Sequence, residues 1–299
     1  MSNFADLTAL VARSAERIEK ERRLPPELLE ALHAGGWFRM LLPKAYGGGE
    51  TDPVGFVETI SEIARHDAST AWCLGQNCVC SMVAAFVEPE VAQTIYGRDP
   101  RAVLAWGPGP SARAVPVEGG WRISGSFAFA SGGRHANWLG GYCRIDGAEH
   151  GRTMLFPADK AQMSDIWQVI GLRGTASDAY EVKDLFVPAA FSVSRDDQAE
   201  RRCEGPLYWL PTGSMYAAGF AGVAIGLARA LVDALVALAL EKTPRGYKTR
   251  LRESALFQSD LAQTEARLRS ARAYLLGTLA EVWREVQKTN RLTLEQRMA

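Results

Sequence analysis

The hydrophobic pattern changes its period twice along this chain, from helical spacing to strict alternation and back to helical spacing. A segment with the helical period cannot place its apolar side chains on one face of a strand, so each change marks a new kind of structure. The pattern predicts an N-terminal α-helical domain over 1–98, a β-domain over 99–205 and a C-terminal helical bundle over 206–299. The predicted fold class is multi-domain α+β.

The first region carries clear helix boundaries. Pro25 and Pro26 are expected to begin a helix that ends at Gly35 and Gly36, because proline fits the first turn and glycine favours the end. The segment 45–52 reads as a loop, and 53–86 contains two further apolar helices.

The central region is a series of short strand patterns with no helix between them, and this order favours an antiparallel barrel or sandwich over a parallel sheet. Glu118, Gly119 and Gly120 predict a hairpin turn. The strand patterns lie at 102–106, 112–117, 121–130, 137–145, 153–157 and 178–188.

The third region contains one apolar run, 215–240, that is long enough to span a membrane. Arg229 and Asp233 lie inside it and would be costly in lipid, so we expect a buried helix at the centre of the bundle. A long amphipathic helix is predicted over 252–287. Residues 292–299 look like the start of another helix, and the bundle is expected to be incomplete at the end of this chain.

Composition excludes several classes of protein. The 34 basic and 34 acidic residues give zero net charge, so there is no electrostatic case for nucleic acid or an anionic membrane. Five irregularly spaced cysteines without a C-x-x-C pair indicate reduced thiols in a cytoplasmic protein. The four histidines lie far apart, which argues against a metal site, and the N-terminus lacks the apolar core of a signal peptide.

The segment GSFAFASGGRHANWLGG, residues 125–141, is unusually open for a core strand. It places Ser131 directly after an aromatic strand and before two glycines. Glycines let a ligand approach the backbone closely, so the segment predicts a binding site, with a plain surface loop as the alternative.

Two motifs in this order resemble the acyl-CoA dehydrogenase superfamily. They are LPPELLEALHAGGWFRMLLPKAYGGGE (24–50) and GLRGTASDAYEVKDLFVP (171–188), the latter similar to the G-x-R-x-T-x-S strand of that family. The resemblance implies a flavoprotein with an α domain, a central antiparallel β-barrel and a C-terminal helical bundle, usually assembled as a tetramer. It also implies that Phe129 and Ser131 lie along the flavin ring.

The chain departs from the dehydrogenases at two places. AWGPGPSARA (105–114) stands where they carry T-E-P-G-A-G-S-D, and FASGGRHANW (129–138) is closer to the F-x-S-G-x-x-H-A-x-W run of the flavin-dependent monooxygenase branch. That branch hydroxylates aromatic or polycyclic compounds with reduced flavin from a separate reductase. Its serine contacts flavin N5 and shelters the oxygen adduct.

The resemblance assigns three groups of residues. Ser131 and His135 are the expected catalytic residues, and Trp72, Asn77 and Trp138 are expected to line the substrate pocket. The expected cofactor-binding residues, the last three of which would reach a neighbouring subunit's flavin, are Trp106, Gly107, Phe129, Ser131, Arg245, Phe257 and Gln258.

The leading expectation is a monooxygenase that uses reduced FAD or FMN and O2, together with a separate flavin reductase and as a homo-oligomer held through 206–299. The alternative is an acyl-CoA dehydrogenase that desaturates an acyl thioester. A third interpretation is a flavin-free relative that acts only as a binding partner.

Overall fold

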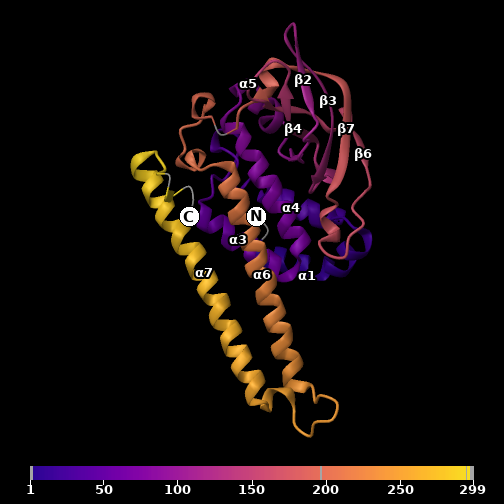
Figure 1. Ribbon diagram of the computed structural model, residues 1–299, viewed down its shortest axis with the longest axis vertical. Coiled ribbons are helices and arrows are strands. Elements are labelled where there is room, and N and C mark those ends of the chain that lie inside the picture. Colours follow the sequence, from indigo (N-terminus) through magenta and orange to yellow (C-terminus); the bar gives the residue numbers. More distant parts are fainter. Residues whose placement is uncertain (1–2, 196, 294, 297–299) are drawn as a thin grey trace.

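The computed structural model describes residues 3–195, 197–293 and 295–296 and shows a helical body, a β-sheet on one side and a long helical hairpin (Figure 1). Half of the predicted closing helix at 292–299, residues 294 and 297–299, therefore lies outside the described residues. The helices are α1 (Phe4–Glu21), α2 (Pro26–Ala34), α3 (Pro53–His66), α4 (Ala68–Ser81), α5 (Pro89–Ala92), α6 (Thr212–Glu241) and α7 (Ala255–Thr289).

Short polar side chains cap the N-termini of α3 and α4. Asp52 accepts hydrogen bonds from the backbone N–H groups of Val54 and Gly55 at the start of α3. Asp67 does the same for Thr70 at the start of α4. The predicted boundaries of α2 at Pro26 and Gly35 are confirmed.

The sheet has eight strands in the order β6-β7-β3-β2-β4-β5-β8, and β1 pairs with β4. Most pairs are antiparallel, but β1 and β2 each run parallel to β4. The strands are β1 (Leu104–Trp106), β2 (Arg113–Val117), β3 (Gly120–Ala130), β4 (Trp138–Ile145), β5 (Arg152–Pro157), β6 (Gln162–Ser164), β7 (Asp178–Pro188) and β8 (Ser192–Val193).

The predicted β-domain is confirmed, but it is not a closed barrel. The short strands β6 and β8 lie at opposite ends of the strand order and do not pair with each other. A barrel requires this last pairing, so the structure is an open sheet rich in antiparallel pairs. The domain boundaries at 98/99 and 205/206 stay predictions.

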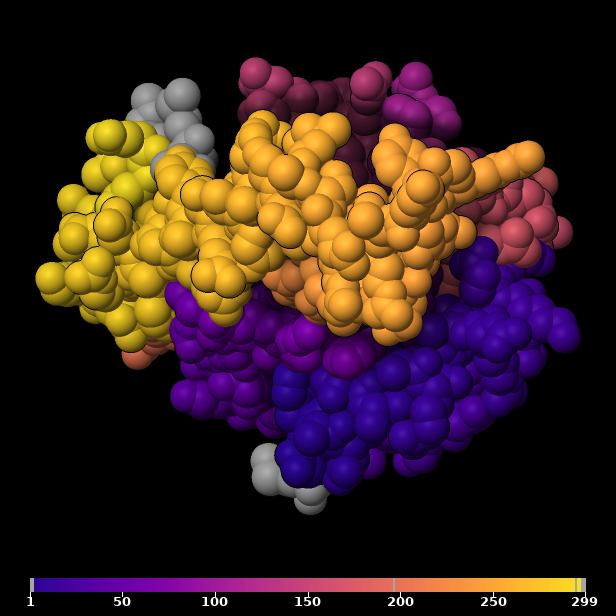
Figure 2. All heavy atoms as spheres, turned by 90° about the horizontal axis from the view of Figure 1, so that it is seen from below, coloured from indigo at the N-terminus to yellow at the C-terminus, as the bar shows by residue number. Residues whose placement is uncertain are grey.

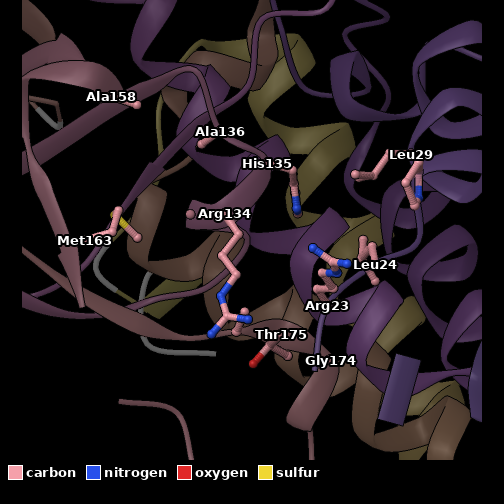
Figure 3. Close-up of a pocket in the computed structure, with 13 residues that line it drawn as sticks. Arg23, Leu24, Leu29, Arg134, His135, Ala136, Ala158, Met163, Gly174 and Thr175 are labelled. Carbon is pink, nitrogen blue, oxygen red and sulfur yellow. The ribbon is translucent and has the colours of Figure 1, made fainter. Parts of the chain in front are cut away.

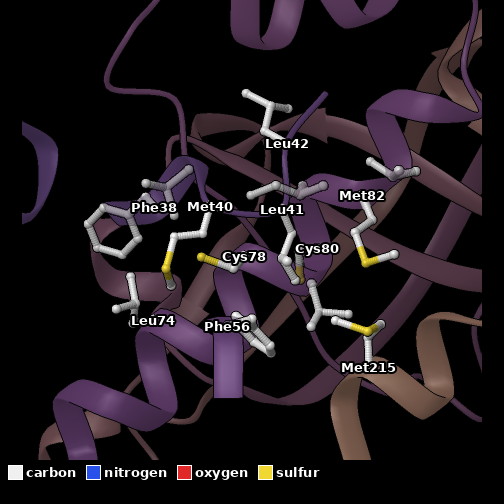
Figure 4. Packing of buried hydrophobic residues seen from close by; sticks show 14 of the residues in the cluster. Phe38, Met40, Leu41, Leu42, Phe56, Leu74, Cys78, Cys80, Met82 and Met215 are labelled. Atoms are coloured by element: carbon white, nitrogen blue, oxygen red, sulfur yellow. The ribbon is translucent and has the colours of Figure 1, made fainter. Parts of the chain in front are cut away.

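The helical core is rich in sulfur-containing side chains. Met40, Cys78 and Cys80 pack beside Met82 and Met215, and the last of these belongs to α6 (Figure 4). Burial raises the pKa of the Cys78 thiol to about 12, so this side chain behaves as a small apolar group. All five cysteines are free thiols.

Helix α6 packs closely on α3 in its N-terminal half. A Cβ at Gly226 would lie 2.1 Å from the carbonyl oxygen of Ser61, so glycine is required for this approach. The C-terminal half leaves the body with α7 and forms a hairpin, seen end-on in Figure 2.

The prediction that 215–240 is a buried central helix is therefore wrong for this half. In an apolar 18-residue stretch of α6, only 22% of the residues are buried, although α6 is long and apolar enough to span a membrane by length and composition. Leu231 is 63% exposed. Arg229, which interrupts the apolar run, pairs with Glu265 of α7 at 2.6 Å and with Asp233 at 2.8 Å.

Candidate functional site

A cavity of about 630 Å³ lies where the end of the sheet meets α4 and α6. Seven of its sixteen lining residues are aromatic, and Arg195 is the only charged side chain among the described lining residues. The lining consists of Trp72, Gln76, Trp106, Gly107, Pro108, Phe129, Ser131, Tyr142, Thr153, Trp167, Leu172, Thr175, Ser177, Arg195, Tyr216 and Phe220.

Phe129 reaches the cavity because β3 is irregular at this point. The register with β7 shifts between Phe127 and Ala130, and Phe129 has a φ of +59°, in the left-handed region that aromatic residues rarely adopt. The shift turns the Phe129 ring out of the sheet, where it is 59% exposed and meets Trp167 edge-on at 6.0 Å. Strain of this kind concentrates at binding sites.

Gly107 brings the backbone after β1 against β3. A Cβ at this position would lie 1.8 Å from the carbonyl oxygen of Ala128, so no other residue fits. The preceding residue, Trp106, presents its ring to the guanidinium of Arg195, with 4.6 Å between Cζ and the ring centroid. This contact holds a positive charge at the cavity wall.

Ser131 is nearly buried, and its hydroxyl group has two protein partners. The indole Nε1–H of Trp72 donates to Ser131 Oγ at 2.9 Å, and the Ser177 hydroxyl lies 2.7 Å away. Trp72 itself is held by Phe220 of α6, which stacks on it with 4.5 Å between ring centroids and 10° between planes. The helical body thereby fixes the position of a hydroxyl group at the end of the sheet.

His135 and Asn77 do not line this cavity. The Asn77 amide donates to the carbonyl oxygens of Leu104 and Ser131, so its Oδ1 faces His135 and accepts from the Nε2–H group at 3.0 Å. Burial lowers the pKa of His135 to about 3, and the ring is neutral. Asn77 thus supports the Ser131 backbone from behind.

His135 lies instead at a second cavity of about 510 Å³ between the α1–α2 region and the sheet (Figure 3). Arg23, Arg134 and Met163 also line it. Arg134 is neutralised there by Asp178, whose carboxylate lies 2.6 Å from its Nε. The catalytic role of His135 stays a prediction.

The remaining predicted residues are dispersed. Trp138 stacks on Phe191 at 5.8 Å and lines neither cavity. Arg245 lies in the exposed loop after α6, and Phe257 and Gln258 lie in the first turn of α7, at the far end of the hairpin (Figure 1). The cavity brings together Trp72, Trp106, Gly107, Phe129 and Ser131.

Sequence reasoning missed several lining residues. Thr175 and Ser177 stood within the quoted GLRGTAS motif, which could have pointed to them. Arg195, Tyr216 and Phe220 carried no local signal, because only the fold brings their segments to the cavity. No group of metal-binding side chains occurs among the residues that the structure describes.

The lining fits a flat aromatic cofactor with a polar edge. Trp72, Trp106 and Phe129 offer aromatic surfaces, and the Ser131 hydroxyl lies among them as a hydrogen-bonding group. Backbone at Gly107 borders the same space without a side chain. These features define a flavoprotein of the acyl-CoA dehydrogenase fold: the helical body, the sheet rich in antiparallel pairs and the cavity between them.

Comparison with known proteins agrees with this class. Residues 4–97 match the acyl-CoA dehydrogenase N-terminal domain, and residues 218–299 match the acyl-CoA dehydrogenase C-terminal domain. A solved structure, the 3-HSA hydroxylase from Rhodococcus sp. RHA1, superimposes with a TM-score of 0.91 at 25% identity and covers 99% of this chain and 79% of that one.

Curated relatives define the branch. The pigment production hydroxylase of Rhodococcus erythropolis is 33% identical over 95% of this chain and 76% of its own length. Indole-3-acetate monooxygenase of Pseudomonas putida is 30% identical over 90% of this chain and 69% of its own length. The oxygenase component of the FADH2-dependent resorcinol hydroxylase of a Rhizobium strain is 28% identical over 94% and 72%.

The chain belongs to the flavin-dependent monooxygenases of the acyl-CoA dehydrogenase superfamily. This confirms the predicted superfamily, the flavin cofactor and the preference for a monooxygenase over an acyl-CoA dehydrogenase. The chain spans 57 to 64% of the length of the oxygenase subunits named HsaA, which are further relatives.

Proposed function

We propose that this chain is the oxygenase component of a two-component monooxygenase and hydroxylates an aromatic small molecule. The observation that carries this proposal is the aromatic cavity around Ser131, whose residues fit the flavin that the family uses. When bound, reduced flavin supplies the two electrons with which one atom of O2 enters the substrate and the other leaves as water.

The chain contributes binding, orientation and exclusion of water. Trp72, Trp106 and Phe129 would form the apolar walls around the flavin, and Ser131 Oγ would accept a hydrogen bond from N5–H of the reduced ring. Arg195, held at the cavity wall by Trp106, would bind an anionic part of the substrate or of the flavin side chain. The proposed cofactor is reduced FAD or reduced FMN.

The proposed partners are a separate flavin reductase and further copies of the chain. The resorcinol hydroxylase relative from Rhizobium is an oxygenase component, and this supports a separate reductase. The exposed leucines of α6 support a homo-oligomer held through the α6–α7 hairpin, because one chain leaves this apolar face uncovered. The proposed location is the cytoplasm.

The test is oxygen transfer by the purified protein with reduced flavin supplied by a general flavin reductase. Phenols, resorcinol and indole-3-acetate are suitable first substrates, and incorporation of one ¹⁸O atom from ¹⁸O2 is the expected result. The acyl-CoA dehydrogenase alternative predicts instead that an acyl-CoA bleaches protein-bound oxidised flavin without O2. Bleaching without oxygen transfer would overturn the proposal.

A further inference from the structure

Four hydrogen bonds in series join five residues of the cavity wall. Trp72 Nε1 lies 2.9 Å from Ser131 Oγ, which lies 2.7 Å from Ser177 Oγ. Ser177 Oγ lies 2.7 Å from Thr175 Oγ1, which lies 2.9 Å from the carbonyl oxygen of Leu172. We call these groups the hydroxyl chain.

The two ends of the hydroxyl chain fix the direction of every bond in it. A carbonyl oxygen only accepts, so Thr175 spends its single hydroxyl proton on Leu172 and can only accept from Ser177. Ser177 therefore donates its hydroxyl proton to Thr175, and in the bond between Ser131 and Ser177 the donor must be Ser131. An indole N–H only donates, so Ser131 accepts from Trp72.

These bond directions decide which hydrogen-bonding group Ser131 offers to a ligand in the cavity. Its proton points to Ser177 and one of its lone pairs faces Trp72, so the group that remains for a cavity ligand is a lone pair. Ser131 therefore presents an acceptor to the cavity and no donor. Ser131, Ser177 and Thr175 are all buried, which limits the access of water to these hydrogen bonds.

Flavin changes its hydrogen-bonding character at N5 with its redox state. Reduced flavin carries N5–H, a donor, whereas oxidised flavin has a lone pair there. An acceptor at Ser131 can form a hydrogen bond with N5–H of reduced flavin. With oxidised flavin, a lone pair of Ser131 Oγ and the lone pair of N5 would face each other and repel.

We propose that the hydroxyl chain makes this site select reduced over oxidised flavin, with Thr175 and Ser177 as positioning residues for Ser131. The inference rests on the proposed function, because it requires flavin beside Ser131. It adds a physical cause for the uptake of flavin in its reduced form and the release of the oxidised form.

The test compares the dissociation constants of oxidised and reduced flavin, the latter measured anaerobically, in wild type and Thr175→Val. Valine keeps the shape and removes the last hydroxyl, so Ser177 is free to donate to Ser131, and Ser131 is free to donate into the cavity. Leu172 keeps a partner, because Trp167 Nε1–H also donates to its carbonyl oxygen at 3.0 Å. The preference for reduced flavin should fall about tenfold, the effect of one hydrogen bond that changes direction.

The midpoint potential of bound flavin gives an independent readout. A tenfold loss of preference for the reduced form lowers the potential of this two-electron couple by about 30 mV. Thr175→Ser restores a hydroxyl and should restore the wild-type value. Ser177→Ala breaks the chain one bond nearer to Ser131 and should act like Thr175→Val, which keeps the test open if valine destabilises the fold.

Ser192→Ala is the matched control. Ser192 also accepts an indole N–H, from Trp121 at 3.1 Å, and donates to a carbonyl oxygen, but it does not line the cavity. It should leave the preference and the potential unchanged. An unchanged preference in both Thr175→Val and Ser177→Ala would overturn the inference and leave the proposed function standing, whereas a wild type that binds neither form of flavin would overturn the proposed function.

Discussion

Phe127 and Phe129 lie two residues apart on β3, yet Phe127 is fully buried and Phe129 is 59% exposed. In a regular strand these two side chains would share one face of the sheet. The bulge between Phe127 and Ala130 separates them, so that Phe127 stacks on Tyr180 in the sheet core and Phe129 enters the cavity. The same strand therefore serves the fold with one ring and the site with the other.

Substitutions of Phe127 and Phe129 should have separate effects, the first on the stability of the fold and the second on flavin binding. Phe127→Ala should lower the free energy of unfolding by about 3–5 kcal/mol, because it empties a packed core position. Phe129→Gly should leave it within about 1 kcal/mol, since glycine tolerates the positive φ, but should weaken flavin binding. Urea unfolding and flavin titration of both variants check this, and a large stability loss in Phe129→Gly would contradict it.

Ser131→Ala should change the fate of oxygen more than the binding of flavin. One neutral hydrogen bond contributes about 1 kcal/mol, so the dissociation constant of reduced flavin should rise about fivefold at most. Without the acceptor for N5–H, more hydrogen peroxide should be released per reduced flavin oxidised. Ser81→Ala removes a buried hydroxyl that bonds only within α4 and is the control. Equal peroxide yields in Ser131→Ala and wild type would remove Ser131 from the proposed chemistry.

Arg195→Met should weaken the binding of one anionic group. Methionine keeps much of the length of the side chain and removes the only charge among the described lining residues. Titration with FMN and with riboflavin, which lacks the phosphate, distinguishes the two possible partners. Selective loss of FMN affinity assigns Arg195 to the phosphate, whereas loss of affinity only for carboxylate substrates assigns it to the substrate. Full affinity for all of these ligands would contradict the binding role.

Acid should destabilise the fold through His135. Its pKa in the folded protein lies far below the value of about 6.5 in an unfolded chain, because burial disfavours the charged ring. Above pH 6.5 both states are neutral and the stability is fully present. Below it the unfolded chain takes up a proton that the folded protein refuses, so the free energy of unfolding falls by at most about 1.4 kcal/mol per pH unit.

His135→Gln provides the comparison, because glutamine keeps an N–H donor for Asn77 and does not titrate. Its free energy of unfolding should fall less steeply between pH 7 and pH 5 in urea experiments. The pKa of His33 is also lowered, by burial and then by Arg101, so a residual slope of the same sign should persist. Identical slopes in the variant and the wild type would refute the prediction.

Leu231→Glu should separate the proposed oligomer into smaller species. Leu231 is 63% exposed on the free half of α6, so the change should cost a single chain little stability. A charge in an interface between copies would be left unpaired and would oppose association. Sedimentation at micromolar concentration is the measurement, with Val115→Glu on β2 as an exposed apolar control outside the hairpin. A wild-type chain that is already monomeric would contradict the proposal.

The sequence by itself determined the order of helices and strands and pointed to the segment at the end of β3 that lines the cavity. Periodicity is a local property, and the segment around Phe129 and Ser131 carried its glycines and aromatic residues within a few positions. The motif GLRGTAS likewise contained Thr175 and Ser177, whose hydroxyl groups are hydrogen-bonded in series with Ser131.

Only the tertiary structure decided which neighbours in sequence share a cavity. His135 follows Ser131 by four residues, but the left-handed turn at Gly132 (φ +73°) directs it to the second cavity. Arg195 and Phe220 come from distant segments that long-range packing brings to the first cavity. The apolar sequence of α6 does not reveal whether the helix is covered by its own chain or by another surface, because the hydrophobic effect has no direction. Only the packing of α3 against the first half of α6 showed which part is buried.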